Sequence, residues 1–416
     1  MWSTLTLRTM TPVFNSDGDP ARAEIRVPSL RGGMRFWMRA MTGILAGDDL
    51  SALRAIEDRV LGSTGNASPI RLRVRAQPAR TLDEDPDFLS WRGRAEPGRR
   101  WGHEQPGQWI GYLLGPGLVS WSKDKRRMVL NRAFVPAGEE FALSVRLVGD
   151  DEDAHRCALA ALWLSLTYGG IGARTRRGFG SVRIVGVEGP AAGFGPPSPE
   201  TPGLEHYASA RSLWPSGPAA AAMPALLRIA GELGLKGAHV WKRTPDHPVL
   251  SKEHTLAGMH GDPAWTSWEE ALTAAGRELR YFRAETEHRD QNKYRPPIKT
   301  FGWEEVVHGP GNELPMAAMG LPLVYDKKFE VHAVAGDEKL RRASPLWIRP
   351  VTDGRTWRLF SFGFLNRFLP EDRVEVHLWR DRRRDKVLKV TDADAHALVR
   401  EWVAHLTAGG SFVRDV

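Results

Sequence analysis

Glycine and arginine are concentrated in one stretch of twelve residues, 169–180, which reads GGIGARTRRGFG and contains no acidic residue. An apolar helical pattern precedes it at 158–166, and an alternating strand pattern follows it at 181–187. The phosphate-binding loop of a nucleotide site has the opposite order, because it follows a strand and opens a helix. Arginines on a backbone that glycines leave mobile fit the phosphates of RNA or DNA better. A solvated arginine cluster at a helix exit is the alternative.

Within this loop, arginine side chains supply the charge, and main-chain amides at Gly172, Gly178 and Gly180 are expected to face a phosphate. The loop residues predicted to contact a nucleic acid are Gly172, Arg174, Thr175, Arg176, Arg177 and Gly178.

A second cationic pattern lies on a predicted helix of about 17 residues that begins after Pro28 and Ser29, with Ser29 as its N-cap. Arg31, Arg35 and Arg39 recur every four residues, so they form a stripe that could follow a phosphate backbone. Ion pairs on a solvated helix face are the alternative. The neighbouring face carries the expected core residues Leu30, Met34, Trp37, Met38, Met41, Ile44 and Leu45.

A third basic cluster follows Trp121 and comprises Lys123, Lys125, Arg126 and Arg127. Cations beside an aromatic ring suit single-stranded nucleic acid, although a charged hairpin tip has the same composition. The similar run at 381–386 includes compensating acids, and we expect a solvated turn there.

The composition of the chain excludes several kinds of site and of protein. The 416 residues carry a formal charge of +8, and Cys157 is the only cysteine, which excludes an internal disulfide or a cysteine-rich zinc site. Residues 1–190 hold 27 Lys and Arg against 21 Asp and Glu, whereas the rest hold 31 against 29. No signal-peptide pattern or long apolar run occurs, so we expect a cytoplasmic protein with no membrane partner.

The elements of the first half occur in the order β-α-β-β-α-β, with strands at 4–8, 70–75, 141–147 and 181–187. This order is typical of the ferredoxin-like fold. An insertion at about 78–138 is predicted to form loops and a hairpin. We expect an α+β protein with a first domain at 1–190, a linker at 191–222, and a second, more divergent α+β domain at 223–416. Strands are predicted at 321–325, 345–349 and 357–364, and helices at 224–233, 265–283 and 392–407.

Residues 28–40, PSLRGGMRFWMRA, resemble the first-helix motif of the RAMP superfamily, the ferredoxin-like RNA-binding subunits of CRISPR effector complexes, and the loop 169–180 resembles its glycine-rich signature. Segments 11–14, 61–65 and 342–346 narrow the resemblance to the two-domain RAMP subunit of type III-B (Cmr) complexes. The resemblance implies two ferredoxin-like, RRM-like domains and a non-catalytic role. It implies contact with the 3′ part of the guide RNA, with the paired target RNA, and with other RAMP subunits.

Catalytic chemistry finds little support in the sequence. His103, His155, His254 and His260 have no convincing acid–base or metal spacing, and the turn at 15–19 lacks the distal glutamate of a calcium loop. No catalytic residue, metal or cofactor is predicted. A guide-processing endoribonuclease of the same superfamily, and a scaffold that contacts only protein, remain the alternatives.

Overall fold

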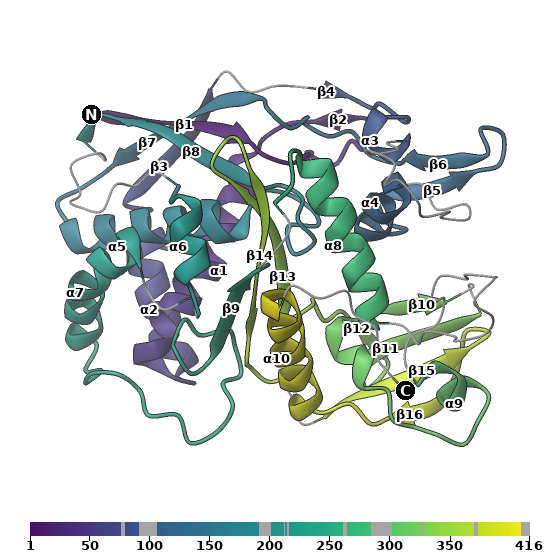
Figure 1. Cartoon of the computed structure of the whole chain (residues 1–416). Helices are drawn as coiled ribbons and strands as arrows, with labels where there is room; N and C mark the ends of the chain where they lie inside the picture. The colour runs from purple at the N-terminus through teal and green to yellow at the C-terminus, as the bar shows by residue number, and fades with distance from the viewer. Residues whose placement is uncertain are drawn as a thin grey trace.

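The fold was analysed in a computed structural model of the whole chain, shown in Figure 1. The structure describes residues 1–75, 80–90, 106–190, 201–211, 213, 216–260, 264–283, 302–325, 328–369 and 373–408.

The first half folds around an antiparallel four-stranded sheet. Its strands lie in the order β3 (Ile70–Arg75), β7 (Glu140–Leu147), β1 (Trp2–Thr9) and β8 (Val182–Glu188). In chain order this is second, third, first, fourth, the arrangement of a ferredoxin-like fold. The predicted fold of this half is therefore confirmed.

Helices cover one side of this sheet: α1 (Val27–Ala46), α2 (Leu50–Leu61) and α5 (Glu152–Leu164), which continues into a π-helical turn, Ser165–Gly169. All seven residues of the predicted core face of α1 are buried, because they share one side of the helix. The prediction of Ser29 as N-cap is wrong. Arg26 is the N-cap residue and makes no side-chain capping bond, because the helix begins at Val27, with Pro28 in its first turn.

Two further helices, α6 (Leu204–Ser209) and α7 (Gly217–Glu232), add to the same core. Ala222, Leu226 and Ile229 of α7 are buried in it. Within the predicted linker, residues 204–209 and 217–222 are therefore helical, and the alanine-rich start of α7 contributes to the buried face.

The second half repeats most of the first topology. Its central sheet has the order β13 (Leu346–Thr352), β14 (Trp357–Phe364), β9 (Thr255–Met259), which matches the first three positions of the first sheet. Helix α8 (Trp268–Arg283) follows β9, and α10 (Asp392–Ala408) follows β14.

Each half also carries inserted elements. In the second half they are α9 (Trp303–Val307), a 3-10 turn (Pro315–Met319), β10 (Leu323–Tyr325), β11 (Phe329–Ala335), β12 (Glu338–Leu340), β15 (Val374–Arg380) and β16 (Arg383–Leu388). In the first half they are β2 (Arg22–Ala23), β4 (Arg80–Thr81), α3 (Asp87–Ser90), α4 (Pro106–Leu114), β5 (Val119–Ser122) and β6 (Arg127–Leu130). The predicted hairpin is the pair β5–β6, whereas α3 and α4 were not predicted.

Candidate nucleic-acid interface

The glycine-rich loop, residues 169–180, is fixed by backbone hydrogen bonds. The Ile171 N–H donates to the Gly180 carbonyl at 2.9 Å, and the Gly180 N–H donates to the Pro12 carbonyl at 2.9 Å. Gly180 has a φ of +68°, and a Cβ there would overlap the Ile171 carbonyl. Its glycine is required because two backbone segments approach closely. The expectation of a mobile loop is therefore wrong.

The three amides expected to face a phosphate have different surroundings. The Gly180 amide is already bonded to Pro12, and Gly178 is buried against Leu272 and Pro350 of the second half. Only Gly172 of these three is exposed. The prediction of a phosphate-facing amide is thus wrong for Gly180 and is opposed by burial at Gly178.

Two loop arginines attach the loop to the second half of the chain. The Arg176 guanidinium donates to the Ser344 carbonyl and lies 4.8 Å from the centre of the Trp347 ring. The Ile348 N–H donates to the Arg176 carbonyl at 3.2 Å, and Arg177 forms a parallel bridge with Ile348. Burial lowers the pKa of Arg176 to about 10 and that of Arg177 to about 9. Both side chains are therefore only partly exposed, and Arg177 also interacts electrostatically with Arg283 of α8 and Tyr112 of α4. These surroundings oppose the predicted contact of Arg176 and Arg177 with RNA.

Arg174 differs from its neighbours. It is exposed, has a φ of +63°, and extends its guanidinium along Gly115, in the turn after α4. Partial burial lowers its pKa, and no carboxylate pairs with it among the residues that the structure describes. Arg174 is therefore the loop cation best placed for an external phosphate.

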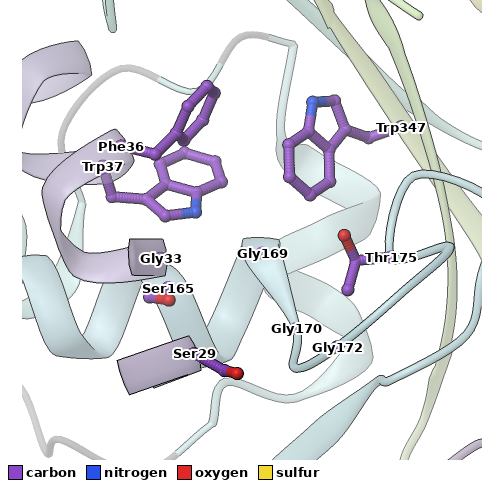
Figure 2. A pocket seen from close by; sticks show the side chains of 10 residues that line it. All are labelled: Ser29, Gly33, Phe36, Trp37, Ser165, Gly169, Gly170, Gly172, Thr175 and Trp347. Carbon is purple, nitrogen blue, oxygen red and sulfur yellow. The ribbon is translucent and has the colours of Figure 1, made fainter. Parts of the chain in front are cut away.

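A cavity of about 330 Å³ brings the loop and the helix motif together, as Figure 2 shows. Its lining comes from α1, the π-helical turn, the loop and β13, and comprises Ser29, Gly33, Phe36, Trp37, Ser165, Gly169, Gly170, Gly172, Thr175 and Trp347. A Cβ on Gly169 would come within 2.6 Å of the Trp37 Nε1. The lining offers hydroxyl groups and aromatic rings but no titratable side chain, so it is equipped for binding and not for proton transfer.

The arginine stripe of α1 is largely engaged within the protein. Arg35 and Arg39 both pair with the buried carboxylate of Glu57 on α2, and the Arg39 Nη2 lies 3.1 Å from the Glu57 Oε1. Arg31 donates to the Ile70 carbonyl at 2.8 Å, and Arg35 to the Gly62 carbonyl at 2.6 Å. The stripe thus joins α1 to α2 and β3, which favours the ion-pair alternative. The Arg39 side chain is still 57% exposed, and its contact with RNA remains a prediction.

At the β5–β6 hairpin, the basic cluster is only partly neutralised. Lys125 pairs with Glu84 at 2.8 Å, and Arg127 pairs with Asp85. Lys123 and Arg126 have no ion-pair partner within the described part of the chain, and the nearby Trp121 side chain is 64% exposed. The hairpin tip therefore presents two cations beside an aromatic ring. Of the run at 381–386, only residues 381–382 form a turn between β15 and β16, whereas residues 383–386 belong to β16.

The described histidines among those considered from the sequence are engaged within the protein. His155 is buried, and its Nε2 lies 3.0 Å from the Val148 carbonyl, while the His254 Nδ1 lies 2.9 Å from the Ser251 Oγ. His103 lies outside the described residues. Among the residues the structure covers, no cluster of His, Cys, Asp and Glu could hold a metal ion.

Two features of this region were not predicted from the sequence. Arg349 of β13 is buried and donates to the Leu166 carbonyl at 2.8 Å, and burial lowers its pKa. It joins the two halves beside the loop. Exposed arginines also line the outer side of β3 and β7; the alternation of the 70–75 segment was the signal for them.

A family model described as the RAMP superfamily matches residues 6–183. The chain is 27% identical over 354 residues to the CRISPR system Cmr subunit Cmr1-1 of Pyrococcus furiosus, covering 84% of this chain and 83% of the relative. It is 28% identical over 181 residues to the CRISPR system Cmr subunit Cmr1-2 of the same organism, covering 43% of this chain and 92% of the relative.

Among solved structures, the chain is similar to apo Cmr1 from Pyrococcus furiosus, with 19% identity, a TM-score of 0.49 and coverage of 97% of both chains. It is also similar to a chain of the type III-B Cmr-beta complex bound to cognate target RNA, with 13% identity and a TM-score of 0.42. This similarity covers 97% of this chain and 99% of the other. Within the described part of the chain, no helix has the length and hydropathy of a membrane span.

Proposed function

We propose that this chain, whose residues 6–183 match the RAMP superfamily model, is a non-catalytic RNA-binding subunit of a type III-B CRISPR effector complex. In this role it contacts the 3′ part of the guide RNA and the target RNA paired with it, and it docks beside other RAMP subunits. Its relatives of similar sequence are Cmr subunits of CRISPR systems.

One observation carries the proposal. The two motifs that resemble the superfamily, at 28–40 and 169–180, meet at a single cavity that lacks titratable side chains. The exposed Arg174 lies in the same loop, and Gly172 and Ser29 of the cavity lining are exposed. Arginine contacts with phosphate give affinity with little sequence preference, which suits a subunit that must accept any guide sequence.

The test is filter binding of the full chain to single-stranded RNA at several salt concentrations. If about four phosphates are neutralised, log K falls against log salt with a slope near −3. Arg174→Ala should weaken binding without changing thermal stability, because this side chain has no ion-pair partner in the described residues. Arg355→Ala, at another exposed arginine, is the control and should leave affinity unchanged. A flat salt dependence contradicts an RNA-binding role.

The endoribonuclease alternative predicts cleavage of a precursor transcript by the purified protein without metal. The cavity lining contains no acid, base or thiol, so we expect no cleavage. A scaffold that contacts only protein predicts that the isolated chain binds no RNA at any salt concentration.

A further inference from the structure

The outer side of the first sheet carries a compact group of arginines. Arg71, Arg73 and Arg75 of β3 are exposed, while the alternating Leu72 and Val74 pack against the core. Helices α1, α2 and α5 cover the other side of the sheet (Figure 1). Arg146 of β7 is also exposed and lies directly opposite Arg71 in the antiparallel register. These four side chains, called the sheet-face arginines below, project from the same side of two neighbouring strands.

This arrangement is unfavourable for the protein alone. Like charges directly opposite each other on an antiparallel pair destabilise the sheet, and Arg71 and Arg146 are such a pair. None of the sheet-face arginines has an ion-pair partner among the described residues.

The other charged groups on this side are few and largely engaged. Arg8 pairs with Glu140, and their hydrogen bond is 2.9 Å, while Arg183 donates to the Thr352 carbonyl at 3.1 Å. Glu188 of β8 lies opposite Thr4, and the strands β7 and β1 separate β8 from β3. The cationic excess at β3 and β7 is therefore left for an external anion.

The spacing of the charges indicates which anion. Residues two apart on a strand lie about 6.5 Å apart, and successive phosphates of an extended RNA strand have a similar spacing. Arg71, Arg73 and Arg75 therefore match three consecutive phosphates in a way that scattered carboxylates of an acidic protein surface would not. Trp2 is 37% exposed and lies opposite Arg146, where an aromatic ring can stack on a base.

We propose that the outer side of the β3–β7–β1 sheet binds a single strand of RNA, its phosphates on the sheet-face arginines and one base on Trp2. This inference rests on the proposed RNA-binding role and adds a second contact surface to the loop. A strand bound here neutralises the Arg71–Arg146 repulsion, so the bound RNA stabilises this sheet.

The experiment compares two triple variants of the full chain in binding to a single-stranded RNA oligonucleotide. The first is Arg71→Gln, Arg73→Gln, Arg75→Gln. The control removes the same charge from scattered exposed arginines: Arg54→Gln, Arg355→Gln, Arg382→Gln. Each lost phosphate contact removes about 0.7 from the salt slope. The first triple should therefore have a slope less steep by about 2 and an affinity about a hundredfold lower at 0.1 M salt, with the control near wild type.

Without RNA, the thermal midpoint of the first triple variant should be unchanged or higher than that of the wild type, because the repulsion between Arg71 and Arg146 is removed. Arg146→Gln tests the same face by a single change from the other strand, and should also weaken binding without lowering the midpoint.

Equal RNA affinity of the two triples overturns this inference, and it leaves the RNA-binding role intact if the wild type still shows a steep salt slope. Failure of the wild type to bind any RNA overturns both. Normal RNA affinity of the first triple together with loss of a protein subunit from the reconstituted complex would assign this face to a protein partner and overturn the inference.

Discussion

The clearest stability prediction concerns Glu57, which holds the arginine stripe of α1. Its carboxylate is buried and accepts hydrogen bonds from both Arg35 and Arg39. Glu57→Gln keeps the size of the side chain but replaces one acceptor oxygen with an amide that faces guanidinium donors. At least one charge-assisted hydrogen bond is then lost, which is worth about 1.5–3 kcal/mol.

The loss of Coulomb attraction lowers the free energy of unfolding by a smaller amount. The Arg35 and Arg39 side chains are 33% and 57% exposed, so water screens their charges. We therefore expect Glu57→Gln to lower the free energy of unfolding by about 2 kcal/mol. In a domain of this size, that corresponds to a decrease of about 4–8 °C in the thermal midpoint.

The assay is thermal unfolding followed by tryptophan fluorescence, run in parallel with RNA filter binding. Glu313→Gln is the control, because its ion pair with Lys389 is exposed on both sides and should contribute less than about 1 kcal/mol. If the stripe is structural, RNA affinity changes less than twofold. An unchanged midpoint would refute the structural role of Glu57. A tenfold gain in affinity would show that Glu57 withholds RNA-binding arginines.

Three further perturbations test the packing of the protein. Gly180→Ala should cost at least about 3 kcal/mol in urea unfolding, because its Cβ would overlap the Ile171 carbonyl, whereas Gly138→Ala, also at positive φ but in open space, should cost about 1–2 kcal/mol. Ser361→Ala should cost about 2 kcal/mol, because its hydroxyl bridges the Trp402 indole and a buried carbonyl. Burial lowers the pKa of His206, so the unfolded chain takes up a proton below about pH 6.5 that the folded chain does not. Stability should therefore fall as the pH drops below that value, and His206→Gln should lessen the fall; an unchanged urea midpoint between pH 7.5 and 5.5 argues against it.

Much of the fold could be predicted from local patterns in the sequence. The seven apolar residues of α1 recur at helical spacing, and all are buried. The order of strands and helices in 1–190 predicted the ferredoxin-like sheet, because this order is typical of that topology and the strands of the insertion pair outside the four-stranded sheet. The second half could not be assigned in the same way, since inserted strands separate α8 from β13 and β14 from α10.

The environments of the arginines depended on contacts between distant residues. Nothing near Arg35 in the sequence indicates that Glu57, on a helix not predicted, lies beside it. The burial of Arg176 requires pairing with Ile348, which no local pattern reveals. The exposure of Arg71, Arg73 and Arg75 follows from simple alternation along the strand, but alternation alone does not indicate that the charged side is a binding surface.

The central claim is that this chain supplies RNA affinity to an effector complex and no cleavage chemistry. The most direct measurement compares target capture and cleavage by the reconstituted complex with and without this chain. The account predicts that the complex lacking it binds target RNA more weakly but cleaves at an unchanged rate once target is saturating. Undiminished target affinity, or loss of cleavage at saturating target, would contradict it.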